Sequence, residues 1–433
     1  MLEIGLSRVD ITPPVGIKMR GFAAREPSLG IHDQLKATSL VLSDGTTSVA
    51  LVSCDLCSVD APLVKMIREE TRLRTGIPES QIVIACTHNH YGPEVSERES
   101  AADVMAYRAV LKFHLAGAIQ EAQANMDKAV MGTGWGESNI GINRRQKLPD
   151  GTIVLGQNPE REIDRQVGII RFEDSKGSPS ACTVNFACHA VCQGPETRLV
   201  SSDFPGKMRE VVGNLTGTTC TFLQGACGNI NPILMERSYE PAKTLGAQLG
   251  CEVVKVWEET KTGPVRSLAV TSKTIQVPRY DYGSGDKAEA RAATLEEHVE
   301  KLRAEGATEG LIKWAEIRRR RAIEALESWK KGKPMPKVSA EIQVWGIDDL
   351  GMAFVPAEIF NEIGVYVKKH SPFSNTFFVG YANGQIGYVP IREAYSEGGY
   401  EVDDACQVGP EAEGLIIETC LDLLEKAHKE TQV

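Results

Sequence analysis

The spacing of apolar residues predicts strands and helices that follow one another along the chain. Apolar runs typical of strands cover residues 36–54, where two runs flank the turn Ser43-Asp44-Gly45, and residues 81–86. Between them, the pattern predicts an amphipathic helix from 61 to 75 that ends near Gly76. A strand, a helix and a second strand form a βαβ unit, so we expect a sheet with parallel pairs.

The rest of the chain continues this mixture. We expect helices at 100–127, 240–259 and 411–427, and strands at 167–172, 182–188, 219–224, 341–347, 352–355 and 376–381. From 285 to 331 the residues are mainly Ala, Glu, Lys, Arg and Leu at helical spacing, which predicts an inserted helical hairpin. Its basic run 318–321 is interpreted as a solvated helix face. The fold predicted is therefore α/β, with a mixed β-sheet core flanked by helices, in one domain over 1–433.

Composition narrows the classes of function. A net charge of -10 argues against binding to nucleic acid, and no stretch approaches the roughly 20 apolar residues that span a bilayer. The chain starts without a basic leader and apolar run, and its 11 cysteines are odd in number and irregularly spaced. We therefore expect reduced thiols and a cytoplasmic protein.

Two histidines follow the apolar strand at 81–86, in the run Thr87-His88-Asn89-His90. Extended backbone directs residues i and i+2 to the same side, so both imidazoles are expected to face one pocket. Reactive residues in parallel sheets collect just past the carboxyl ends of strands. The spacing alone leaves two interpretations open: a metal or catalytic site, or a pair of hydrogen-bonded surface histidines.

His189 also follows an apolar segment, and by itself it is open between a satisfied core residue and a metal ligand. The cysteines of the chain do not show whether His189 is a core residue or a metal ligand. Cys54 and Cys57 have CxxC spacing, but no second such pair lies at zinc-ribbon distance, so buried thiols are the interpretation that we prefer.

The Gly-rich loop at 225–232 contains Cys227, Asn229 and Asn231. Two interpretations of this loop stay open: a tight turn, or a loop whose backbone closely approaches a ligand. We do not expect Cys227 to be a nucleophile. Three further segments carry candidate side chains: Glu358 directly after a strand, a Gly-rich aromatic loop at 380–390 that is followed by Tyr400, and Asn143-Arg144-Arg145 with an anion-binding guanidinium.

In this order, the segments resemble the neutral/alkaline non-lysosomal ceramidase family over nearly the whole chain. The matching pieces are Asp10-Ile11-Thr12-Pro13-Pro14, Gly30-Ile31-His32-Asp33, the run 87–93, Asn143-Arg144, Asn185-Phe186 through His189, Gly228-Asn229-Ile230-Asn231-Pro232, Pro356-Ala357-Glu358, and Tyr388-Val389 with Tyr400-Glu401.

The resemblance implies one catalytic zinc ion held by two His, one Glu and one Tyr, which here are His88, His189, Glu358 and Tyr388. It further implies that His90, Arg144 and Tyr400 contact the substrate or the reacting amide. The family hydrolyses an amide that links a fatty acid to a sphingoid base.

The chain departs from the family at its nucleophile. The Ser of a Gly-Asp-Val-Ser-Pro loop aligns with Asn231, and the Asp aligns with Asn229. An amide side chain cannot be deprotonated to attack a carbonyl, which excludes a covalent Ser route at this position. The chain is also too short for the family's C-terminal β-sandwich and lacks its secretion signal. We therefore expect a substrate other than ceramide.

These observations predict a hydrolase that uses a water activated by zinc, or by another divalent metal, to cleave an amide, ester or lactone of a small acyl-containing substrate. His90 would take or relay the proton, Arg144 and Tyr400 would steady the oxyanion, and Asn229 and Asn231 would orient the substrate. Two alternatives stay open: an inactive ceramidase-like scaffold or binding protein, and a thiol enzyme that uses Cys54 and Cys57, or Cys227.

Overall fold

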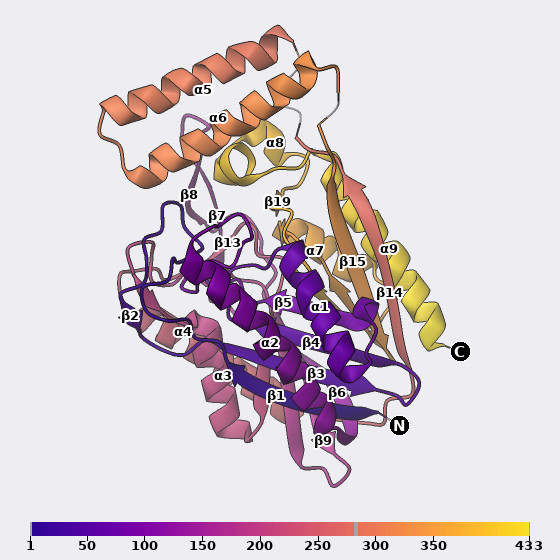
Figure 1. Cartoon of the computed structure of the whole chain (residues 1–433). Coiled ribbons are helices and arrows are strands. Elements are labelled where there is room, and N and C mark those ends of the chain that lie inside the picture. Colours follow the sequence, from indigo (N-terminus) through magenta and orange to yellow (C-terminus); the bar gives the residue numbers. More distant parts are fainter. Residues whose placement is uncertain (1, 281–284, 334, 433) are drawn as a thin grey trace.

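A computed structural model describes residues 2–280, 285–333 and 335–432. Two β-sheets pack face to face, and helices cover the outer face of each, so the architecture has four layers (Figure 1). The predicted α/β class, with its sheet core flanked by helices, is confirmed. Among the described residues, none of the helices is both long enough and apolar enough to cross a bilayer.

The elements of the first half of the chain build the larger sheet, its helical layer and two small sheets. The helices are α1 Ala61–Thr75, α2 Ala102–Ala124, α3 Asp203–Thr216 and α4 Glu240–Glu259. The strands are β1 Glu3–Asp10, β2 Gly30–Ile31, β3 Lys36–Ser43, β4 Ser48–Cys54, β5 Ile82–Cys86, β6 Asp127–Glu137, β7 Gly141–Lys147, β8 Ile153–Asn158, β9 Gln166–Asp174, β10 Pro179–Phe186, β11 Leu199–Val200, β12 Thr219–Gln224 and β13 Ile230–Pro232. The two small sheets are β11-β2 and β13-β7-β8.

The elements of the second half build the smaller sheet and the inserted hairpin. The helices are α5 Asp286–Ala304, α6 Glu309–Lys330, α7 Asn361–His370, α8 Ala394–Glu397 and α9 Glu411–Thr431, with a single helical turn at Glu401–Ala405. A similar turn, Glu79–Gln81, lies between α1 and β5 in the first half of the chain. The strands are β14 Leu268–Val277, β15 Val338–Ile347, β16 Leu350–Phe354, β17 Glu358–Ile359, β18 Asn375–Val379 and β19 Tyr388–Val389.

The larger sheet has the order β12-β10-β9-β6-β1-β3-β4-β5 and is buried on both faces. Successive residues of a strand point to opposite faces. In β3, Val41 therefore packs under the helices α1–α4, while Leu40 and Leu42 pack against the second sheet. Burial on both faces explains why these strands are continuous apolar runs rather than alternating patterns.

This sheet bends so strongly that its two edges meet. β1 and β6 pair over only two positions, Glu3 with Lys128 and Ile4 with Asp127. Beyond these pairs, the strands β12-β10-β9-β6 separate from the strands β1-β3-β4-β5. β4 nevertheless lies beside β12, because Ser53 Oγ donates to the Phe222 carbonyl at 2.5 Å. The ends of β5, β10 and β12 are consequently brought to one place, which is where the candidate site lies.

The smaller sheet, β14-β15-β16-β18, packs one face on the larger sheet and the other on α7 and α9. Trp345, Met352 and Phe377 are among the side chains that fill the space between the two sheets. The loops at the edge of this sheet carry β17 and β19, so the second half of the chain supplies its own part of the candidate site.

Most predicted elements are present. β4, α1 and β5 form the expected βαβ unit with β4 and β5 parallel. Asp60 caps α1 by accepting from Leu63 N, and Gly76 ends it with a φ of 75°. Among the longer elements, the sequence patterns did not identify β1, β6, β7, β8, β14, α3 or α7.

The inserted hairpin is confirmed as α5 and α6, which stand away from the layers at the top of Figure 1. The interpretation of the basic run as a purely solvated face is wrong at two of its positions. Arg318 pairs with Asp404, and Arg321 Nη1 donates to the Asp404 and Cys406 carbonyls at 2.6 and 2.9 Å. These arginines attach the hairpin to the loop that carries Tyr400.

Candidate metal centre and active site

The two histidine loops are joined at the meeting point of the sheet edges. Asn89 and Ala190 form an isolated parallel bridge, and His90 N donates to the Ala190 carbonyl at 3.2 Å. His88 and His189 each precede a residue of this bridge. Their rings lie 4.6 Å apart, centroid to centroid.

Gln224, the last residue of β12, fixes both loops from behind. Its Nε2 donates to the carbonyls of Thr87 at 3.1 Å and Cys188 at 2.7 Å, and its Oε1 accepts from Cys188 N at 3.1 Å. Thr87 and Cys188 are the residues directly before His88 and His189. A single fully buried amide thereby sets the spacing between the two imidazoles.

We expect Gln224→Met to lower metal affinity about 10- to 100-fold, the usual cost of losing a group that orients ligands. The methionine keeps the volume of the side chain but cannot hold the two carbonyls. Metal competition with a chromophoric chelator measures the effect. Gln343→Met is the matched control, because Gln343 is equally buried but bonds the Ser80 carbonyl away from the histidines. Equal affinities in both variants would contradict the assignment.

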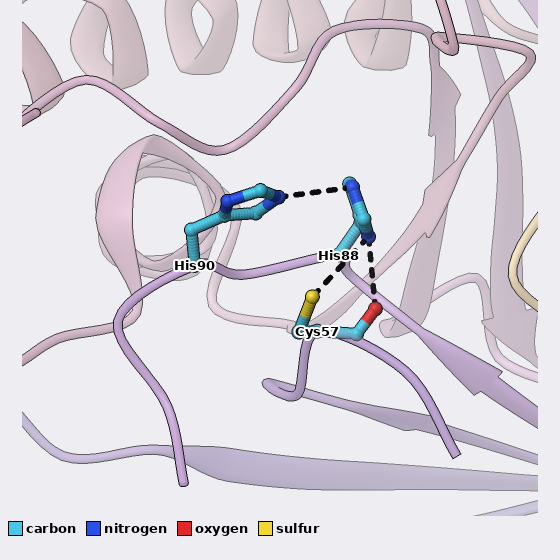
Figure 2. Close-up of side chains that lie close together, drawn as sticks. All are labelled: Cys57, His88 and His90. Carbon is cyan, nitrogen blue, oxygen red and sulfur yellow. Dashed lines mark hydrogen bonds between the residues drawn. The ribbon is translucent and has the colours of Figure 1, made fainter. Parts of the chain in front are cut away.

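His88 and His90 face each other, although not for the reason that the sequence suggested. His88 is not extended but left-handed, with a φ of 57°, which is uncommon for a residue with a side chain. Its Nδ1 donates to the Cys57 carbonyl at 2.8 Å, and its Nε2 lies 3.0 Å from His90 Nε2 (Figure 2). The backbone bond fixes the orientation of the His88 ring and directs its Nε2 toward the site.

His189 is oriented in the same way. Its Nδ1 donates to the carbonyls of Cys227 at 2.7 Å and Ile230 at 3.0 Å, so its Nε2 carries the lone pair. Burial, with Arg144 nearby, lowers the pKa of His189 to about 3, which keeps this ring neutral. His189 therefore has the form that binds metal ions. Burial would lower the pKa of His88, but Cys57 and Glu358 raise it to about 10, so a metal ion would have to displace a proton from this ring.

Glu358 and Tyr388 arrive from the second half of the chain as direct partners. They face each other in the parallel pairing of β17 with β19. Glu358 Oε2 lies 3.4 Å from His88 Nε2 and 3.7 Å from His189 Nε2. Burial would raise the pKa of Glu358, but the two histidines hold it well below its usual range, so the carboxylate is charged.

These residues fit a divalent metal ion. Ligand atoms roughly 2.05 Å from a tetrahedral zinc ion lie about 3.3 Å apart, close to the separations between Glu358 and the two histidines. One ligand atom of each of His88, His189 and Glu358 falls within 4.8 Å of the others. A divalent ion would take the place of the His88 proton as a positive partner of the buried Glu358 carboxylate. That these side chains bind a metal stays a prediction.

Arg144 lies across the same group of residues. Its Nη2 donates to Tyr388 Oη at 2.9 Å, and its Nη1 is shared between His189 Nε2 and Asn231 Oδ1, both at 3.2 Å. Glu401 accepts from Arg144 Nε and from Arg145 Nη1, each at 2.7 Å. The guanidinium is thus held in place at the centre of the candidate site, with its charge balanced from behind.

His90 and Tyr400 complete the polar pocket. His90 Nδ1 is buried and has no partner within the described residues, so it is available to a ligand. The Tyr400 ring lies 5.9 Å from the Tyr388 ring and 5.7 Å from the guanidinium carbon of Arg144. On its other side it packs edge-on against Trp314 of α6, which places the inserted hairpin next to the site.

The two asparagines differ in position. The Asn229 side chain is fully buried and occupied by α7, since its Nδ2 donates to Glu362 at 2.9 Å and its Oδ1 accepts from Asn361 N at 2.8 Å. Asn231 is half-buried and contacts Arg144. Their predicted contact with substrate stays a prediction, and the geometry gives Asn231 the better access.

Burial disfavours thiol chemistry at Cys54 and Cys227, whereas Cys57 lies with His88 and His90 in a second group of possible metal ligands. Burial raises the pKa of the Cys54 and Cys227 thiols well above the usual range, which opposes formation of the thiolate nucleophile. Cys57 Sγ lies 3.8 Å from His88 Nδ1, but that nitrogen already donates to the Cys57 carbonyl (Figure 2). All described cysteines except Cys251 are buried, as the sequence analysis expected.

Sequence reasoning missed several residues that shape the site. Besides Gln224, these are Gln385, whose Nε2 donates to Glu358 Oε1 at 2.8 Å, and the pair Gly21-Phe22. A Cβ on Gly21 would come within 2.6 Å of His90 Cγ, and the Phe22 ring packs edge-on against His90 at 4.9 Å. The one sequence signal for this close contact with His90 was a glycine next to an aromatic residue.

Comparison with known proteins relates the chain to one family. The family described as neutral/alkaline non-lysosomal ceramidase, N-terminal, matches residues 2–219, which include His88, His90, Arg144 and His189. Neutral ceramidase A of Dictyostelium discoideum is 27% identical over 224 residues, and neutral ceramidase of Oryza sativa subsp. japonica is 25% identical over 222 residues. Each match covers 47% of this chain but only 30% and 28% of those proteins, respectively.

Solved structures extend the similarity of fold to the whole chain. A ceramidase complexed with C2 superposes with a TM-score of 0.77 at 17% identity, covering 99% of this chain and 75% of the other. The neutral ceramidase from Pseudomonas aeruginosa gives a TM-score of 0.72 at 19% identity and covers 98% and 75%, respectively. The match to the family model ends at residue 219. The later residues, including Glu358 and Tyr388, are related to the ceramidase fold by the structural superposition.

Proposed function

The chain belongs to the neutral/alkaline non-lysosomal ceramidase family, and from this premise we propose that it is a metal-dependent hydrolase that cleaves an amide bond. One observation carries the proposal: His88 Nε2, His189 Nε2 and Glu358 Oε2 converge beside the Arg144 guanidinium. We further propose that zinc is the metal and that Tyr388 is the fourth ligand, since two imidazoles, a carboxylate and a phenol oxygen suit zinc.

A divalent ion at this place supplies a polarised substrate carbonyl and a water of lowered pKa. The side chains of the protein do the rest. Arg144, which Glu401 holds, and Tyr400 beside it would donate hydrogen bonds to the oxygen that becomes negative. Burial and the neighbouring His88 and His189 hold the pKa of His90 well below its usual range, so this ring is a neutral proton acceptor.

Asn231 has a supporting role in this proposal. Arg144 Nη1 has two acceptors, His189 Nε2 and Asn231 Oδ1. When the His189 lone pair binds a metal ion, Asn231 is the acceptor that still holds the guanidinium. An asparagine cannot act as a nucleophile, so we propose direct hydrolysis without an acyl-enzyme and a substrate other than ceramide.

The proposal is tested by assaying a panel of N-acyl amides, esters and lactones before and after treatment with a chelator. We expect amide hydrolysis that falls at least about 100-fold on removal of the metal and returns with added zinc, because metal polarisation contributes several kcal/mol. His189→Ala should abolish this recovery, whereas His370→Ala, a substitution at an exposed histidine of α7, should leave it intact. Full activity of the chelated protein would contradict the proposal.

A further inference from the structure

A cavity of about 860 Å³ lies beside the residues proposed to bind metal, between them and the inserted hairpin. Arg20, Ser58 and Gln385 line it from the body of the protein, and Lys313 and Ile317 line it from α6. It borders the site directly, because Gln385 Nε2 donates to Glu358 Oε1 and Ser58 follows Cys57, whose carbonyl orients His88.

The wall of this cavity combines apolar surface with many polar side chains. Most of its lining side chains are charged or carry hydrogen-bonding groups, and charges of both signs are present. Gln385 Oε1 is buried without a partner within the described part of the chain. Long alkyl chains bind in pockets lined by apolar and aromatic side chains, so this wall is suited to a polar portion of a substrate.

Most carboxylates of the wall are already paired with a cation, whereas the exposed Glu97 has no ion-pair partner among the described residues. Asp60 accepts from Arg108, Glu341 from Arg68, and Glu99 from Lys18. Glu94 receives Arg20 Nη1 on both oxygens at 2.8 Å, and its Oε1 also accepts the backbone N–H groups of Val95 and Ser96.

Arg20, by contrast, keeps donors free. Only its Nη1 is bonded, to Glu94, so Nε and Nη2 have no partner among the described residues. Arg20 N donates to the Gly92 carbonyl at 3.0 Å, and the next residue, Gly21, packs on His90. A guanidinium with its backbone fixed and one nitrogen already bonded presents the remaining N–H groups in the geometry that a carboxylate accepts.

We propose that Arg20 binds a carboxylate of the substrate in this cavity, and that the enzyme therefore hydrolyses compact, anionic N-acyl compounds. The inference rests on the proposed amide hydrolysis and adds the substrate class. The carboxylate can belong to the amine portion, as in an N-acyl amino acid, or to the acyl portion, as in a monoamide of a dicarboxylic acid. Both present the same group to Arg20, and the substrates below separate them.

The experiment compares the wild type with Arg20→Gln/Glu94→Gln, a double variant that keeps a hydrogen-bonded pair but removes both charges. Arg237→Gln/Glu196→Gln is the matched control, because it removes an exposed Arg–Glu pair outside the cavity. Arg20→Lys keeps the charge and loses the planar fork. The probes are N-acetylglycine and N-methylsuccinamic acid, each paired with its neutral carboxamide, together with a long-chain uncharged N-acyl amide.

We expect the wild type to favour one carboxylate probe over its carboxamide by about tenfold or more in kcat/KM, mainly through KM. The Arg20→Gln/Glu94→Gln variant should lose this preference while still hydrolysing the carboxamide, Arg20→Lys should keep part of it, and the control should keep all of it. A wild type that prefers the long-chain uncharged amide, or a double variant that retains the preference, would overturn the assignment.

A binding measurement tests the role of Arg20 independently of the proposed hydrolysis. Calorimetry on chelator-treated protein should show that the preferred carboxylate probe binds at least about tenfold more tightly than its carboxamide, and that the difference disappears in the double variant. If this difference is found but no amide is hydrolysed, the proposed activity is wrong while Arg20 still binds carboxylates. If hydrolysis is found without any binding difference that depends on Arg20, the inference is wrong and the proposed activity stands.

Discussion

Glu358→Gln is expected to lower kcat/KM for amide hydrolysis by about a thousandfold. The substitution keeps the size of the side chain and its bond to Gln385, but it removes the only charged ligand of the proposed set. Loss of metal polarisation is worth several kcal/mol, and each tenfold in rate corresponds to about 1.4 kcal/mol. Steady-state hydrolysis of the best substrate from the panel, at saturating and limiting zinc, measures the effect.

The control for this variant is Glu425→Gln, which changes an exposed carboxylate of α9 that pairs with Lys429. It should leave kcat/KM within about twofold, since exposed ion pairs contribute little. An activity of Glu358→Gln close to that of the control would show that the carboxylate has no part in the reaction.

Glu401→Gln is expected to lower the free energy of unfolding by about 3–5 kcal/mol, the usual cost of breaking a buried ion pair. Glu401 is fully buried between Arg144 and Arg145, which are buried as well. The glutamine leaves Arg144 without its counter-charge and leaves Arg145 with Glu397 alone. Denaturant unfolding measures the loss. Glu397→Gln is the matched control, because Glu397 also pairs with Arg145 but is one-third exposed, and it should cost less than about 1 kcal/mol.

The cost of Glu401→Gln should depend on pH with a definite sign. Burial would raise the pKa of Glu401, but Arg144 and Arg145 lower it more, so the pKa in the folded state is below the usual value. The stabilisation is fully present above the unfolded pKa of about 4.3 and is lost as the pH falls through the folded pKa. The wild type and the variant should therefore converge in stability below about pH 4. A difference that stays constant to lower pH would contradict this account.

Much of the fold follows from local patterns. The βαβ unit at β4, α1 and β5 combines continuous apolar strands with a helix that has an Asp cap and a terminal glycine, so local signals agree. The strong bend of the sheet does not follow from them. It arises where β1 and β6 pair at only two positions and Ser53 contacts Phe222, contacts between residues far apart in the sequence.

The candidate site, too, follows only in part from local sequence patterns. His88 and His90 are recognisable as a pair at a strand end, but extended backbone was the wrong reason, because His88 adopts a positive φ that only its surroundings explain. Glu358 and Tyr388 were proposed through the family resemblance, and the structure places them opposite each other in β17 and β19. Gln224 and Arg20 have no local signal, since their roles depend on loops that meet only in the folded chain.

The central claim is that His88, His189, Glu358 and Tyr388 form one metal site. Its most direct test is the metal content of the wild type and Glu358→Gln, purified side by side and measured by elemental analysis. We predict about one equivalent of zinc per chain in the wild type and less than about a tenth in the variant, because a charged ligand has been lost. Equal metal content in the two proteins, or a wild type that binds no divalent metal when zinc is supplied, would contradict the claim.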